Sequence, residues 1–155
     1  MVEIQKLHKS FGENHVLCGV DLKIGQCETM VIIGRSGCGK SVLVKHINGL
    51  LKPDSGRILV DDEDITNLKG SKLLQLRRKF GMLFQGAALL DSMTVGENVS
   101  LALRHHTSMS ESEIKERVAS KLAMVGLTGM ESLYPEELSG GMKKRVGLAR
   151  AMILD

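Results

Sequence analysis

The sequence contains no tryptophan, and its only aromatic side chains are three phenylalanines and one tyrosine. Aliphatic residues and nine methionines must therefore fill the core. Cys18, Cys27 and Cys38 are an odd number of cysteines without a CxxC pair, which argues against a disulfide framework or a zinc site and favours a reducing compartment. No apolar run reaches the about 18 residues of a membrane span, and the start of the chain does not resemble a secretory signal.

An excess of one charge is also missing. The 21 basic and 18 acidic residues leave a net charge of +3, which is too small to indicate a nucleic-acid partner. With 43% hydrophobic and 25% charged residues, the composition is that of a globular protein rather than a disordered one. The length of 155 residues suits one ordinary domain.

The first half of the chain has the pattern of short strands around one helix. Alternating or continuous apolar residues predict strands over five segments: 2–7, 16–24, 30–33, 57–60 and 80–84. The apolar spacing of residues 40–51 predicts a helix. Proline and glycine predict a turn over 53–56, and the acidic residues 61–64 resemble a hairpin turn.

From residue 91 onward the pattern is helical. Two capping boxes, Thr94 with Glu97 and Ser110 with Glu113, predict helix starts. An apolar stripe at helical spacing follows the second box and ends at a glycine; its residues are Ile114, Val118, Leu122, Val125 and Gly126. The order predicts one α/β domain that carries a helical subdomain.

The strongest chemical motif is GRSGCGKS, residues 34–41, which fits G-x-x-x-x-G-K-[ST] between a predicted strand and a predicted helix. Glycines let successive backbone N–H groups face one anion, and the N-terminus of the next helix points at the same place. Lys40 would reach the β- and γ-phosphates, and the Ser41 hydroxyl would ligate Mg²⁺. The expected ATP contacts in the loop are Gly34, Arg35, Ser36, Gly37, Cys38, Gly39, Lys40 and Ser41.

Two features have alternative interpretations. Cys38 either fills a position that needs a small residue or is a reactive thiol that nucleotide would protect. Lys143, Lys144 and Arg145 follow LSGG at the start of a predicted helix, where each cation costs about 0.3–1 kcal/mol. Either these side chains point into water or a strongly anionic group docks there.

Together GRSGCGKS, FQGAALLDSMTVGENV and LSGGMKKRVGLARA resemble the ATP-binding subunits of ABC transporters, in the right order along nearly the whole chain. The resemblance implies a P-loop NTPase core with antiparallel strands and a helical subdomain. The implied divisions are about 1–86 for the nucleotide-binding core, about 87–138 for the helical subdomain, and 139–155 for the signature and its helix.

The resemblance also implies roles for single residues. Phe11 matches the aromatic residue that stacks on adenine, and Val16 matches an apolar residue of the same pocket. Gln85 matches the glutamine that contacts Mg²⁺ and the attacking water, so Gln85 and Lys40 are the expected catalytic residues. In a head-to-tail homodimer, the residues that would contact ATP held by the partner subunit are Ser139, Gly140 and Gly141.

Within the family, Met142 after LSGG and the segment around Gln85 resemble the Mla/MCE-type phospholipid transport ATPases. This resemblance implies ATP and Mg²⁺ as cofactors. It also implies an integral-membrane permease, an MCE-type substrate-binding protein, and a cytoplasmic position on the inner face of the cell membrane.

After LSGG the chain contains no apolar run ending in Asp-Glu and no histidine, although the family has both there. We therefore expect a domain that is incomplete at its C-terminus, binds nucleotide and hydrolyses little by itself, whereas the complete domain would be an ATPase. Two alternatives are a non-hydrolysing nucleotide-binding module and a soluble ABC protein outside transport.

Overall fold

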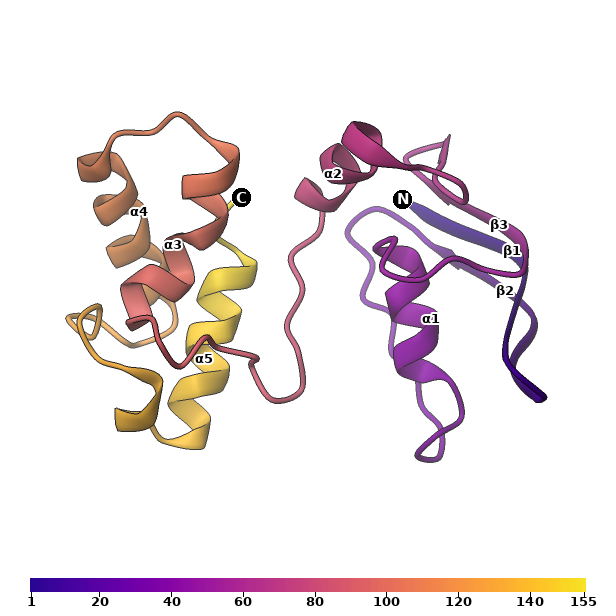
Figure 1. Ribbon diagram of the computed structural model, residues 1–155, viewed down its shortest axis with the longest axis horizontal. Coiled ribbons are helices and arrows are strands. Elements are labelled where there is room, and N and C mark those ends of the chain that lie inside the picture. Colours follow the sequence, from indigo (N-terminus) through magenta and orange to yellow (C-terminus); the bar gives the residue numbers. More distant parts are fainter. The chain divides into compact units, whose positions relative to one another are not determined.

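The computed structural model describes residues 1–155 as two compact units, Met1–Lys79 and Phe80–Asp155. The first unit contains all the strands and two helices, and the second unit is helical (Figure 1). The division falls at residue 79, earlier in the chain than the expected boundary near residue 86.

The sheet of the first unit has four antiparallel strands in the order β2-β1-β3-β4. Their bounds are Val2–Phe11 for β1, Asn14–Ile24 for β2, Ser55–Val60 for β3 and Glu63–Asp64 for β4. The strands predicted over 2–7, 16–24 and 57–60 are confirmed. The predicted acidic hairpin turn is confirmed as well, because Asp61 and Asp62 join β3 to β4 with φ of 50° and 65°.

A bulge in β1 forces a close backbone approach to β3. The register of the β1–β3 pair shifts between Gln5 and His8. There Gly56 has φ 95°, and a Cβ atom on it would lie 2.7 Å from the Gln5 carbonyl oxygen and even closer to that of Lys6. Only glycine fits this position without backbone movement.

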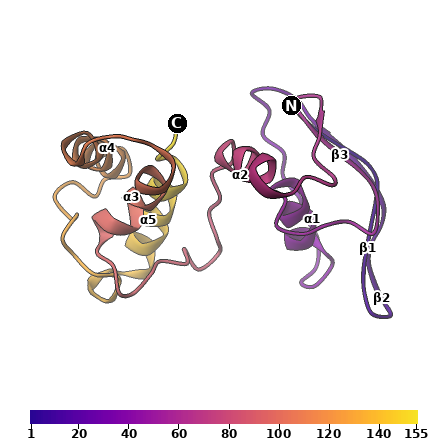
Figure 2. The same cartoon turned by 45° about the horizontal axis from the view of Figure 1, so that its top comes forward.

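Helices α1 (Lys40–Ile47) and α2 (Gly70–Arg78) lie on the same side of the sheet in both views (Figure 2). Helix α1 ends before residue 51, the predicted end, and Gly49 follows it with φ 66°. The buried apolar side chains of this unit come from the strands, both helices and the loop after β4; they are Ile4, Leu7, Leu17, Leu43, Ile58, Val60, Ile65 and Leu76.

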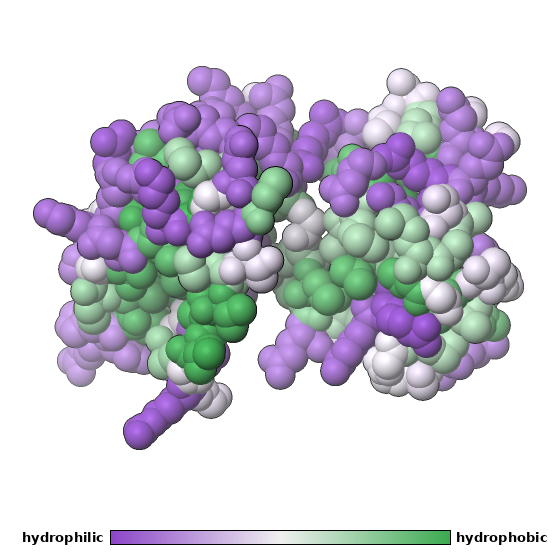
Figure 3. All heavy atoms as spheres, turned by 180° about the vertical axis from the view of Figure 1, so that it is seen from behind, coloured by the Kyte–Doolittle hydropathy of each residue, from purple (hydrophilic) through white to green (hydrophobic).

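The strands predicted over 30–33 and 80–84 are wrong. Neither segment has regular secondary structure or a place in the sheet. Val31 is 70% and Ile33 is 90% exposed, and apolar side chains are visible on the surface of the first unit (Figure 3). An apolar run becomes a buried strand only when neighbouring strands pair with its backbone, and neither segment is paired in the four-stranded sheet.

The second unit contains α3 (Val95–His106), α4 (Glu111–Met124), the 3₁₀ turn Pro135–Glu137, and α5 (Gly140–Ala151). Buried apolar side chains of this unit form one core cluster: Val95, Val99, Leu103, Ile114, Val118, Leu122, Leu127, Leu138, Val146, Ala149 and Ile153. The predicted helices and the predicted apolar stripe of α4 are therefore confirmed.

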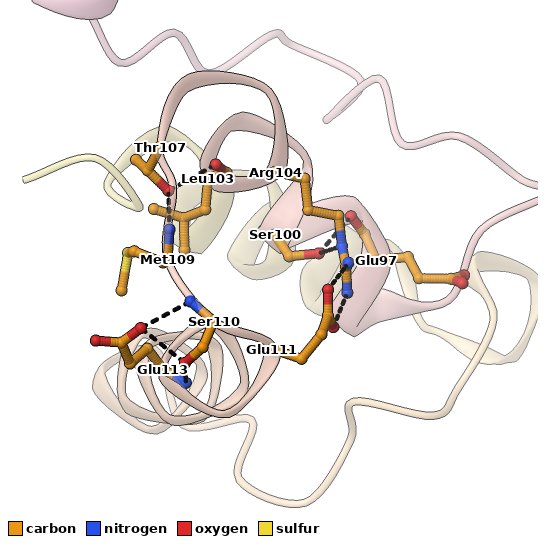
Figure 4. Close-up of polar contacts among 9 residues, drawn as sticks. All are labelled: Glu97, Ser100, Leu103, Arg104, Thr107, Met109, Ser110, Glu111 and Glu113. Carbon is orange, nitrogen blue, oxygen red and sulfur yellow. Dashed lines mark hydrogen bonds and ion pairs between the residues drawn. The ribbon is translucent and has the colours of Figure 1, made fainter.

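Both predicted capping boxes are present. In α4, the Ser110 hydroxyl accepts the Glu113 N–H, and the Glu113 carboxylate accepts the Ser110 N–H at 2.7 Å (Figure 4). Thr94 and Glu97 make the same exchange at the start of α3. Each box satisfies two N–H groups that a helix start leaves unpaired.

Asn98 fixes the chain that leads into α3. Its side chain is fully buried, and its Oδ1 accepts the Leu90 N–H at 2.8 Å. Its Nδ2 lies 3.0 Å from each of three carbonyl oxygens, those of Leu90, Met93 and Thr94. Residues 90–94 are thus tied to the first turn of α3.

Candidate functional site

The backbone of residues 34–41 forms a curved loop that leads into a helix without a side-chain cap. Gly37 and Gly39 have φ of 79° and 96°, a region that residues with a Cβ atom rarely adopt. Gly39 is the N-cap of α1 and offers no side-chain oxygen, and the first turn of α1 has no acidic residue. The first N–H groups of α1 therefore lack side-chain acceptors, and the positive end of the helix dipole is not neutralised.

Lys40 lies folded over this loop. Its ammonium donates hydrogen bonds to the carbonyl oxygens of Gly34 at 2.9 Å and Arg35 at 2.7 Å. Ser41, the next residue, has an exposed side chain. An ammonium, a hydroxyl and uncapped helix N–H groups within one short segment are the groups that hold a phosphate chain with its Mg²⁺.

Cys38 lies against the start of the same loop. A Cβ atom on Gly34 would be 2.7 Å from the Cys38 sulfur, so a side chain at position 34 would require the Cys38 side chain to move. The Lys40 ammonium is 3.8 Å from that sulfur. The thiol is exposed, so the small-residue and reactive-thiol interpretations both stay open.

Strand β2 approaches the loop from its other side. A Cβ atom on Gly39 would lie 2.9 Å from Cγ1 of Val16, so Val16 is next to the start of α1. Phe11, at the end of β1, is 48% exposed, and the Lys9 ammonium lies 5.5 Å from its ring centroid. The predicted adenine contacts, Phe11 and Val16, therefore belong to the same unit as residues 34–41.

Gln85 and the signature belong to the second unit. Gln85 is exposed and precedes Ala87 and Ala88, two consecutive residues with left-handed φ of 62° and 48°. A non-glycine residue in that region is strained and needs support from its surroundings. Gln85 therefore lies at the start of a strained turn.

The signature begins helix α5. Ser139 is its N-cap, and the Ser139 hydroxyl accepts the Met142 N–H at 3.2 Å. Gly140 and Gly141 are exposed, and a Cβ atom on Gly140 would have no neighbour within 4 Å. No acidic residue lies in the first turn. The start of α5 is thus a second open, positive helix end.

The three cations after the signature do not act alike. Arg145 donates to the carbonyl oxygens of Val125 and Gly126, both at 3.1 Å, so it caps the C-terminal end of α4. Lys144 is exposed and Lys143 is half-buried. Arg145 therefore has a structural partner, whereas the two lysines leave positive charge near the start of α5.

Two residues of this region were not identified from the sequence. Asn98 holds residues 90–94, and Arg150 donates to the carbonyl oxygens of Ala88 at 2.8 Å and Ala87 at 2.5 Å. Burial lowers the pKa of the Arg150 guanidinium. No local sequence signal marked Arg150, because its partners lie 62 and 63 positions away.

None of the helices has the length and apolar character required to cross a membrane. No group of three or more His, Cys, Asp or Glu side chains is arranged to hold a metal ion by itself.

Comparisons with known proteins agree with these motifs. Residues 17–155 match the family model described as ABC transporter. The chain is 47% identical over 154 residues to the "Probable ribonucleotide transport ATP-binding protein mkl" of Mycobacterium tuberculosis, and this match covers 99% of the chain and 43% of that protein. It is 45% identical to the chloroplastic protein trigalactosyldiacylglycerol 3 of Arabidopsis thaliana and 47% identical to the methionine import ATP-binding protein MetN of Xanthomonas euvesicatoria.

These matches cover 100% and 98% of the chain but only 45% and 46% of the two relatives, so the chain spans less than half of their length. Among solved structures, a dimeric ATP-binding cassette in a post-hydrolysis state with ADP and Pi has a TM-score of 0.91 at 34% identity, covering 99% of the chain and 69% of that structure. The structure of cbiO1 from Clostridium perfringens has a TM-score of 0.85 at 31% identity, and this match covers 99% of the chain and 61% of that structure. The chain therefore belongs to the ABC transporter family, as an ATP-binding domain of that family.

Proposed function

We propose that this chain binds MgATP at residues 34–41 and belongs to the subunit that couples ATP binding and hydrolysis to transport. The observation that supports this proposal is the combination, in one loop, of a helix start without a side-chain cap, the Lys40 ammonium and the Ser41 hydroxyl. Family membership and the ADP and Pi bound to the similar cassette point to the same ligand.

Each group in the loop would have a defined task. The N–H groups at the start of α1 would hold phosphate oxygens, and Lys40 would move from the carbonyls of Gly34 and Arg35 to the β- and γ-phosphates. Ser41 and Gln85 would hold Mg²⁺, whose charge would neutralise the phosphate oxygens. Phe11 and Val16 would enclose the adenine ring.

We propose that the start of α5 binds the nucleotide of a second subunit in a head-to-tail homodimer. Ser139, Gly140 and Gly141 are exposed, and a Cβ atom on Gly140 would meet nothing within 4 Å, so a γ-phosphate could approach the backbone N–H groups directly. Lys143 and Lys144 would add positive potential there. The similar cassette bound to ADP and Pi is itself dimeric.

We propose an integral-membrane permease as the further partner, which places the subunit on the cytoplasmic, inner face of the cell membrane. The similar protein cbiO1 is part of an ABC transporter complex, cbiONQ. The ATPase supplies the energy in such an assembly, and the permease supplies the path.

The proposed cargo is a phospholipid or another hydrophobic molecule, delivered by an MCE-type substrate-binding protein. The sequence around Gln85 and Met142 supports this choice, and one relative bears the name of a glycolipid, trigalactosyldiacylglycerol. Other relatives are named for ribonucleotide transport and methionine import. Reconstitution with the permease in vesicles, with labelled phospholipid and labelled methionine as competing cargoes, distinguishes them.

ATP affinity of the Lys40→Ala variant tests the nucleotide site. Loss of the ammonium removes charge-assisted bonds to the phosphates, so we expect binding of MgATP to weaken by about tenfold or more, or at least 1.4 kcal/mol. Lys45→Ala, which removes an exposed lysine from the last turn of the same helix, is the matched control and should bind normally. Equal affinity of the Lys40 variant and the wild type would refute the proposed site.

Phosphate release separates an ATPase from a module that only binds nucleotide. We expect the chain of residues 1–155 to bind MgATP with little turnover, and the longer protein assembled with its permease to hydrolyse it. Gln85→Ala should then lower the rate of ATP hydrolysis by the assembled protein more than it lowers the affinity of that protein for ATP. Nucleotide binding without hydrolysis in the assembled protein would favour the binding module.

A further inference from the structure

Helix α5 holds the turn after Gln85 through a single arginine. The two terminal nitrogens of Arg150 donate to the carbonyl oxygens of Ala88 at 2.8 Å and Ala87 at 2.5 Å. These partners are 62 and 63 residues away in the sequence. Only a planar guanidinium presents two donors in a fixed fork that matches two neighbouring carbonyls.

The turn that Arg150 holds is one that the chain disfavours. Ala87 and Ala88 both have left-handed φ, and Ala87 is fully buried. A backbone in this region persists only when its surroundings fix it. The local support is one hydrogen bond from the Ala87 N–H to the Phe84 carbonyl at 2.9 Å.

Close packing brings the same segment against α5 at two glycines. A Cβ atom on Gly147 would lie 2.9 Å from Leu83 and 3.2 Å from the Ala87 side chain. A Cβ atom on Gly81 would overlap the Ala151 carbonyl. Residues 81–88 therefore contact the C-terminal half of α5, where Gly147, Arg150 and Ala151 lie.

We propose that Arg150 is a positioning residue, which locks the turn after Gln85 onto α5 so that Gln85 and the signature move as one body. The proposal rests on the nucleotide function proposed above for Gln85 and for Ser139. A change at the signature would then reach Gln85 through a rigid contact instead of a flexible loop.

The test follows residues 86–90 in the full chain by amide hydrogen exchange and by fluorescence. Because the chain has no tryptophan, Phe84→Trp next to Gln85 introduces a single reporter. Arg150→Met keeps the apolar stem but removes both donors. We expect the Ala87 amide to exchange about tenfold faster in this variant, and acrylamide to quench the introduced tryptophan more strongly.

Arg145→Met is the matched control, because Arg145 lies on the same helix and also donates to two carbonyls, those of Val125 and Gly126. It should leave the exchange of Ala87 and the quenching unchanged. Arg150→Lys retains a cation without the fork and should give intermediate values, which keeps the test possible if the methionine variant does not fold. Equal effects of Arg145→Met and Arg150→Met, or no effect of Arg150→Met, would overturn the proposal.

A kinetic measurement connects the turn to hydrolysis. In the protein assembled with its permease, Arg150→Lys should lower kcat and leave the affinity for ATP unchanged, since Lys40 is not disturbed. A lower affinity with unchanged kcat would contradict a positioning role. The amide-exchange test needs no nucleotide. Its result can therefore overturn the role of Arg150 while Lys40→Ala supports the ATP site, and the Lys40→Ala result can refute the ATP site while the exchange result supports the role of Arg150.

Discussion

Replacing the buried Asn98 by alanine should destabilise the second unit strongly. The side chain offers one acceptor and two N–H hydrogens. The Oδ1 atom accepts one hydrogen bond, from the Leu90 N–H. Three carbonyl oxygens surround Nδ2, which has only two hydrogens to donate to them. The side chain therefore contributes the equivalent of three hydrogen bonds.

At about 1 kcal/mol for each net hydrogen bond, Asn98→Ala should lower the free energy of unfolding by about 3 kcal/mol. The Leu90 N–H and the carbonyls around the removed amide would stay without this partner, which adds to the loss. Since a domain is stable by only about 5–15 kcal/mol, the effect is a large fraction of the total.

Urea unfolding followed by circular dichroism at 25 °C measures this loss. Asn67→Ala removes an exposed asparagine and should stay within about 0.5 kcal/mol of the wild type. A loss below about 1 kcal/mol for Asn98→Ala would show that its contacts are replaced by water, and the reasoning from burial would be refuted.

Three further substitutions test local features. Ser110→Ala removes the side-chain cap of α4 and should lower the free energy of unfolding, measured by thermal unfolding, by about 1 kcal/mol. An unchanged stability would contradict the contribution of the capping box. The Arg104 guanidinium lowers the pKa of Glu111 below its usual 4.5, so this pair stabilises the fold above that pH and the contribution is lost as the pH falls through the lowered pKa. Glu111→Gln should therefore flatten stability against pH in acid, and an unchanged profile would exclude the pair as a cause. Gly56→Ala forces a Cβ atom against the carbonyl of Lys6 and should cost about 2–3 kcal/mol in urea unfolding, whereas a loss below about 0.5 kcal/mol would show that the bulge can shift.

Features that depend on neighbours in the sequence were predictable. The capping boxes join residues three positions apart, so Ser110 and Glu113 define a helix start without any knowledge of the fold. The tight glycine-rich turn before α1 was also predictable, because its glycines and the helix start lie within residues 34–41; binding of phosphate there stays a prediction.

Features that depend on distant partners were not predictable. The apolar pattern of residues 30–33 is that of a buried strand, but a pattern does not say whether another strand lies beside it. The contacts of Arg150 join residues more than 60 positions apart, and no short motif encodes them. The strain at Ala87 was equally hidden, since alanine does not indicate left-handed φ.

The confinement of the large apolar cluster to residues 95–153 bears on the order of folding events. Helix α5 packs against α3 and α4, and its Arg150 contacts residues 62 and 63 positions earlier, whereas β1 and β2 pair as neighbours in the sequence. Because contacts between distant positions form slowly, the hairpin of β1 and β2 should form early, and the apolar cluster should be completed only when α5 joins it.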